Sequence, residues 1–92
     1  MKVIIKGQEY EASLNIEAME IFEEETGKSM MDDESYKVID SKFLTAFTYA
    51  VLNGEVAKET IKKDLSIIEI MEVYQSLQAQ VSKDQKNISK KK

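Results

Sequence analysis

Acidic side chains are the most numerous groups in this 92-residue sequence that could do chemistry, since Asp and Glu together supply 17 residues. Two runs stand out, at residues 23–25 and 32–34. Carboxylate oxygens suit Ca²⁺ or Mg²⁺, but the second run lacks the spaced acids and the glycine of an EF-hand loop. Carboxylate pairs also serve as general acids and bases, yet these acids fall on the expected outer faces of helices. We therefore expect neither a metal site nor a catalytic carboxylate pair.

Hydroxyl groups are the remaining candidate nucleophiles, because the sequence has no Cys and no His. Without them, disulfides, thiol nucleophiles, imidazole bases and ordinary zinc sites are excluded. Ser82 and Ser89 have lysines nearby only because that end of the chain is rich in lysine. The glycines stand singly at Gly7, Gly27 and Gly54, so no glycine-rich loop is present to bind a phosphate or a cofactor. With no catalytic constellation, we expect the protein not to be an enzyme.

The formal net charge of the sequence is −4, and this charge is unevenly distributed along the chain. Five lysines against one aspartate give residues 83–92 a charge of +4, which leaves −8 on residues 1–82. Residues 1–82 are acidic enough to repel nucleic acids and anionic membranes. The sequence also has no Arg, whose guanidinium group usually makes the bidentate hydrogen bonds to phosphate or guanine. A nucleic-acid binder that uses the basic tail as an arm is therefore a disfavoured alternative. The apolar run at residues 3–5 is too short for a signal peptide or a membrane span, so we expect a cytoplasmic protein.

A β-hairpin is expected over residues 2–14. Tyr10, Ala12 and Leu14 alternate with polar residues, which is the period of a half-buried strand. The turn is expected at residues 7–8, where Gly comes first in a two-residue connection. An isolated hairpin is marginal in water, so its apolar face is expected to lie on helices.

A first helix is expected over residues 16–26, between a capping Asn and the left-handed stop at Gly27. Its inner stripe is predicted to consist of Ile16, Met19 and Phe22, and its glutamates lie outside.

A second helix is predicted to begin at Asp33 or Ser35 and to end near Leu52. The Asp-Ser step at residues 40–41 offers an alternative start, because Asp is a good N-cap. A short third helix is expected over residues 55–63.

The clearest element is a helix over residues 66–81. Ser66 and Glu69 form an S-x-x-E capping box at its start. Its apolar residues follow the i, i+3, i+4, i+7 spacing of one helix face: Ile67, Ile70, Met71, Tyr74, Leu77 and Val81. Residues 83–92 contain a single apolar residue, and we expect them to form a disordered, Lys-rich tail.

The sequence therefore predicts a single domain of the α+β class over residues 1–82, mostly helical, with an N-terminal β-hairpin packed on three to four helices. The residues expected in its core are Ile5, Tyr10, Leu14, Phe22, Phe43, Phe47, Ile70, Tyr74 and Leu77.

The order of the elements, together with three short motifs, is the most informative feature of the chain. The first helix closes on ETGKS at residues 25–29, followed by KFLTAFTYAVLNGE at residues 42–55 and by KETIKKDLS at residues 58–66. A final amphipathic helix comes next. This order resembles that of the tail assembly chaperones of long-tailed bacteriophages and related prophages. The resemblance covers most of residues 1–82, and the Lys-rich tail is not part of the family pattern.

The resemblance implies a non-enzymatic chaperone that binds the long, apolar, helical tape-measure protein and keeps it soluble while the tail tube assembles. It further implies the tail tube protein as a second partner, self-association, and a place in the host bacterial cytoplasm rather than in the mature virion. A generic small acidic adaptor that binds proteins through the same helices is the alternative.

A face built from the two long helices is the predicted cover for the client, and the acids of the first helix are predicted to attract its basic stretches. The alternative for these acids is a solvated face that only keeps the protein soluble. The predicted contact residues are Phe43, Tyr49, Met71, Tyr74 and Gln78 on the long helices, and Glu20, Glu23 and Glu24 on the first helix.

Overall fold

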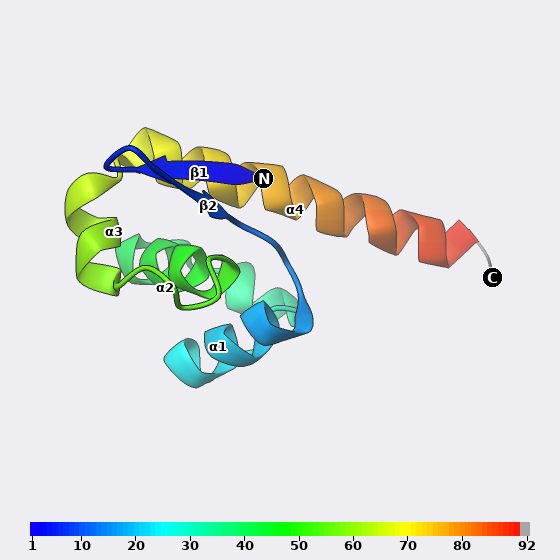
Figure 1. Ribbon diagram of the computed structural model, residues 1–92. Coiled ribbons are helices and arrows are strands. Elements are labelled where there is room, and N and C mark those ends of the chain that lie inside the picture. Colours follow the sequence, from blue (N-terminus) through cyan, green and yellow to red (C-terminus); the bar gives the residue numbers. More distant parts are fainter. Residues whose placement is uncertain (91–92) are drawn as a thin grey trace.

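The computed structural model describes the backbone of residues 1–90 and the side chains of residues 1–79, apart from that of Asp33. In chain order its elements are β1 (Lys2–Ile5), β2 (Gln8–Glu11), α1 (Ile16–Thr26), the 3₁₀ turn η1 (Asp33–Tyr36), α2 (Ser41–Val51), α3 (Lys58–Asp64) and α4 (Ile67–Lys90). This hairpin followed by helices confirms the predicted fold class. α2 lies in the middle and contacts α1, α3 and α4, and the C-terminal part of α4 extends beyond the other elements (Figure 1).

The antiparallel pairing of β1 with β2 leaves Lys6 and Gly7 as the two residues of the connection. Their φ angles are 52° and 79°, so both adopt the left-handed conformation of a type I′ turn, which matches the twist of hairpin strands. The predicted turn, with Gly first, is therefore wrong by one residue. In the observed register Val3 and Ile5 are buried, whereas Ile4 is 58% exposed on the outer face.

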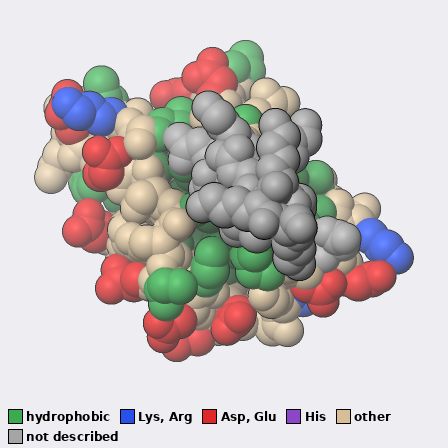
Figure 2. Space-filling view, turned by 90° about the vertical axis from the view of Figure 1, so that its right-hand side faces the viewer, with side chains coloured by type: hydrophobic (Ala, Val, Ile, Leu, Met, Phe, Trp, Pro, Cys, Tyr) green, Lys and Arg blue, Asp and Glu red, His purple; other side chains and the backbone are tan. Residues whose placement is uncertain are grey.

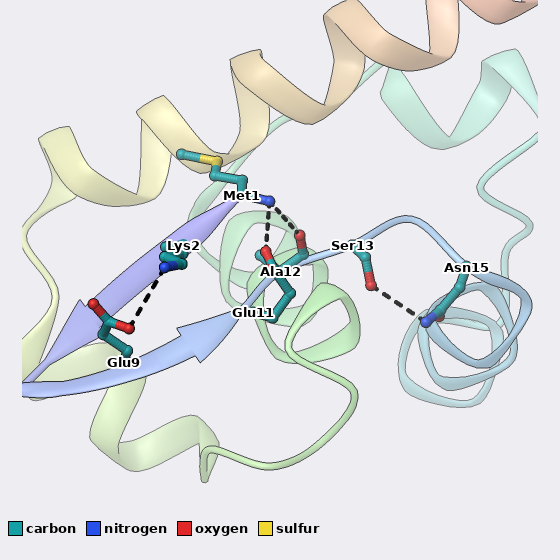
Figure 3. A network of polar contacts seen from close by, with 7 residues as sticks. All are labelled: Met1, Lys2, Glu9, Glu11, Ala12, Ser13 and Asn15. Atoms are coloured by element: carbon teal, nitrogen blue, oxygen red, sulfur yellow. Dashed lines mark hydrogen bonds and ion pairs between the residues drawn. The ribbon is translucent and has the colours of Figure 1, made fainter.

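A small polar network ties the start of the hairpin to its end (Figure 3). The amino group of Met1 donates hydrogen bonds to the Glu11 carboxylate at 2.7 Å and to the Ala12 carbonyl oxygen at 3.1 Å. This positive amino group holds the pKa of Glu11 below its usual value. Lys2 lies 3.9 Å from Glu9, and because both side chains are well exposed the pair contributes little to stability.

The caps of α1 confirm its predicted limits. Asn15 Oδ1 accepts a hydrogen bond from the backbone N–H of Ala18 at 2.8 Å, and Gly27 ends the helix at a φ of 73°. The buried face is centred on Ala18 and Phe22, so the prediction that Ile16 belongs to the inner stripe is wrong. Ile16 lies about 200° around the helix from Ala18, and its side chain is 68% exposed.

The segment between α1 and α2 is not one long helix, because two aspartates cap separate elements. Asp32 Oδ1 accepts from the N–H of Glu34 at 3.0 Å and starts the short 3₁₀ turn η1. Asp40 Oδ1 accepts from the N–H of Phe43 at 2.9 Å and starts α2. The alternative start at residues 40–41 is therefore the correct one.

The core surrounds α2, and aromatic rings join it to its neighbours. Phe43 and Phe47 stack with their centroids 6.1 Å apart, and Phe22 of α1 meets Phe43 edge-on at 5.7 Å. Tyr74 of α4 approaches Phe47 at 5.2 Å. Of the predicted core residues, Ile5, Phe22, Phe43, Phe47, Ile70 and Leu77 are buried, and Tyr10, Leu14 and Tyr74 are partly buried.

The predicted capping box at the start of α4 is confirmed in both directions. The N–H of Ser66 donates to Glu69 Oε1 at 3.0 Å, and the N–H of Glu69 donates to Ser66 Oγ at 3.1 Å. The buried stripe differs from the predicted one, because Ile67 is 62% exposed and Val73 is buried in its place.

The far end of α4 also differs from the prediction. The helical backbone continues to Lys90, past the predicted helix end at Val81. The disorder expected for residues 83–92 stays a prediction. Lys, Gln and Ser are tolerated in helices, and extending an existing helix needs no new nucleation step. The predicted burial of Val81, and residues 91–92, lie outside the part of the chain that is described.

Candidate protein-binding surface

Three of the predicted contact residues form one row along α4. Met71, Tyr74 and Gln78 are half-buried and recur at i, i+3 and i+7. They flank the buried stripe of Ile70, Val73 and Leu77, which faces the core. We call Met71, Tyr74 and Gln78 the α4 row. Because its members are partly covered and lie on one edge of a helix, the row offers an apolar strip with two polar groups to a partner segment.

The hydroxyl of Tyr74 is the first polar group of the row. Its ring packs on Phe43 at 5.6 Å and on Phe47 at 5.2 Å. Burial raises the pKa of Tyr74 above its usual value, and the nearby Tyr36 adds to this shift. The phenol therefore stays neutral at physiological pH and remains a hydrogen-bond donor.

The side-chain amide of Gln78 is the second polar group. Its Nε2 atom is buried and has no hydrogen-bond partner among the described residues. A buried amide donor without an acceptor lowers stability by about 1–3 kcal/mol relative to a satisfied one. An acceptor from a bound segment, such as a backbone carbonyl, would remove that penalty.

The structure does not bring the other two aromatic residues of the predicted face to the α4 row. Phe43 is only 7% exposed and belongs to the core, so its ring is not available at the surface. Tyr49 lies about 200° around α2 from Phe47 and therefore faces away from α4. Its ring centroid is 5.7 Å from Lys58 Nζ, next to α3, and its hydroxyl lies close to Gly54. The predicted face is thus divided between two sides of α2.

The predicted acidic residues Glu20, Glu23 and Glu24 are all exposed on α1. Since α1 and α4 pack on different sides of α2, these acids do not adjoin the α4 row (Figure 1). The neighbouring Glu25 forms an ion pair with Lys58 of α3, and this contact raises the pKa of Lys58.

Exposed apolar side chains form a part of the surface that the sequence pattern missed. Ile67 and Ile68 at the start of α4 are 62% and 68% exposed, and Val38 before α2 is 67% exposed. The face shown in Figure 2, which lies on the side opposite the start of α4, also carries hydrophobic side chains, and most of its acidic side chains lie at the periphery. The apolar spacing alone placed Ile67 in the core. Such spacing does not show which side of a helix start is covered by other elements.

Within the residues that the structure describes, no cluster of three or more acidic residues is arranged to hold a metal ion. None of the described helices is long and apolar enough to cross a membrane. Comparisons of the chain with protein-family models, with curated proteins and with solved structures found no match.

Proposed function

We propose that this protein is a non-enzymatic tail assembly chaperone, which binds the tape-measure protein of a long-tailed phage or prophage and keeps it soluble in the host cytoplasm. The observation that carries the proposal is the order of elements with its motifs. The hairpin, the helix that closes at Gly27, the aromatic central helix and the amphipathic last helix follow one another as in that family. The generic adaptor remains the competing proposal.

The α4 row gives this function a physical basis. A tape-measure chain is a long helix whose apolar stripes aggregate in water unless they are covered. Met71 supplies a soft side chain that adapts to different contacts, and Tyr74 and Gln78 supply polar groups beside it. A strip this narrow binds weakly, so many copies cover one client and the tail tube protein displaces them in turn.

Self-association is the second part of the proposal. The exposed isoleucines at the start of α4, 62% and 68% accessible, are apolar area that a second copy would cover. We expect dimers or larger species at micromolar concentration. Light scattering checks this, and a monomer mass over a wide range of concentrations contradicts it.

The proposal predicts that a gene for a tape-measure protein lies beside the gene for this chain, and co-expression of the two proteins tests the function. We expect the client to be soluble only when this protein is present, and the two to co-purify at low salt. Equal solubility of the client with and without this protein, together with no co-purification, would refute the proposal.

A matched pair of variants tests the surface. Met71→Lys places a charge in the α4 row. It is expected to abolish co-purification, because binding an apolar client would remove the hydration of the new ammonium group at a high free-energy cost. Ser76→Lys adds the same charge to an exposed position of the same helix, about 140° away, and is expected to retain it. If both variants co-purify equally well, the α4 row is not the contact surface.

A further inference from the structure

A hollow of about 690 Å³ lies on the side of the molecule formed by α1, the segment after it, α2 and α3. None of the described side chains of α4 or of the hairpin lines it, so it is separate from the α4 row. The residues that line the hollow are Phe22, Glu25, Thr26, Lys28, Ser35, Val38, Asp40, Lys42, Phe43, Thr45, Ala46, Lys58 and Lys62.

Lysines gather at this hollow, although residues 1–82 carry a net charge of −8. Four line it, of which Lys58 is paired with Glu25 across the gap between α3 and α1. Within the described residues, Lys28, Lys42 and Lys62 form no ion pair. These three lysines come from different elements and line one concavity. Because four lysines line the hollow against two carboxylates, Glu25 and Asp40, its lining has an excess of positive charge on an acidic protein.

The floor of the hollow is apolar. Phe22, Phe43 and Ala46 line its inner side and are almost fully covered by the core, while the other apolar residue that lines it, Val38, is 67% exposed. The buried hydroxyl of Ser35 donates to the Ser29 carbonyl at 2.5 Å, which leaves its oxygen lone pairs as acceptors. An occupant that fits this floor carries a small apolar side chain beside its charges.

We propose that this lysine-lined hollow is a docking site for an acidic, amphipathic peptide segment of a partner protein. Carboxylates of the segment would pair with Lys28, Lys42 and Lys62, and one aliphatic side chain would lie against Val38 and Ala46. Two carboxylates, Glu25 and Asp40, also line the hollow and disfavour the binding of a closely spaced row of phosphates. The exposed apolar edge likewise fits a peptide better than a nucleic-acid backbone. The inference does not rest on the tape-measure proposal.

Binding of a Trp-labelled peptide tests the site. The probe is a short acetylated peptide with one Trp, one Leu and alternating Glu, and its emission is read without interference because the protein has no Trp. We expect saturable binding that weakens as salt rises. The same peptide with Gln in place of every Glu is expected to bind at least about tenfold more weakly, since it loses charge-assisted hydrogen bonds. Absence of binding, or equal binding of the two peptides, overturns the proposal.

Adjacent lysines of α3 supply a matched control. Lys62→Glu reverses a charge in the hollow, whereas Lys63→Glu makes the same change at the next residue, which does not line it. We expect Lys62→Glu to weaken binding about tenfold and Lys63→Glu to leave it nearly unchanged. Lys42→Glu should also weaken it, and the fold tolerates this change because a carboxylate is favourable in the first turn of a helix. Equal effects at positions 62 and 63 overturn the proposal, as does equal affinity for a single-stranded DNA of the same charge.

Discussion

Replacing Phe47 by alanine measures how strongly the aromatic cluster joins the helices. The ring is fully buried and lies 6.4 Å from Phe22 of α1 and 5.2 Å from Tyr74 of α4. Deleting a buried Phe side chain lowers the free energy of unfolding by about 3–5 kcal/mol. A domain of this size has a total free energy of unfolding of about 5–10 kcal/mol. The variant is therefore expected to lose between about a third of its stability and nearly all of it.

Urea unfolding followed by far-UV circular dichroism provides the assay, because most of the described chain is helical. We expect a lower midpoint with little change in the slope, since the surface exposed on unfolding stays similar. Tyr49→Ala is the matched control, because it removes an aromatic ring from the same helix on the side away from α4, and its effect should be clearly smaller. An unchanged midpoint for Phe47→Ala, or an equal shift for Tyr49→Ala, would refute the reasoning.

Three further predictions concern single groups. Ser66→Ala removes one half of the capping box of α4 and should lower the free energy of unfolding by about 1 kcal/mol in the same urea assay. Lys6→Asn should raise the melting temperature slightly. Asn tolerates the left-handed conformation at this position, and the strain relieved, about 1 kcal/mol, exceeds the stabilisation from the ion pair between the exposed Lys6 and Asp64. A lower melting temperature would contradict this. Burial raises the pKa of Tyr74, so the folded state holds the proton more firmly than the unfolded chain. Stability should therefore be intact below the ordinary pKa of 10.0 and fall as the pH rises through the folded value, and Tyr74→Phe should show a smaller fall.

Local capping signals in the sequence correctly predicted both ends of α1 and the start of α4, because each signal depends on residues that are neighbours along the chain. Asn15 and Gly27 bracket α1, and Ser66 with Glu69 starts α4, as predicted. The sequence offered two starts for α2, one at Asp33 or Ser35 and one at residues 40–41. The structure decides for the second, because Asp32 caps a separate 3₁₀ turn and Asp40 caps α2.

The direction in which side chains face was less predictable, because it depends on which element covers a helix. Ile16 and Ile67 fit the apolar spacing but lie on uncovered sides near helix starts. Phe43 and Tyr49 were assigned to one surface, yet helical geometry places the first in the core and the second beside α3. The lysine-lined hollow could not be found from sequence at all, since its lysines come from segments as far apart as Lys28 and Lys62.

The position of α4 after the other described elements affects how the protein folds during synthesis. α4 supplies Tyr74 to the ring cluster and Ile70 and Leu77 to the core, so the side of α2 that faces α4 has no cover until α4 emerges from the ribosome. Ribosomes add roughly 5–20 residues per second, and the hairpin alone is too small to be stable during that time. Folding therefore waits for the last helix, and a ribosome that stalls before α4 holds a chain exposed to proteases and to the general chaperones of the cell.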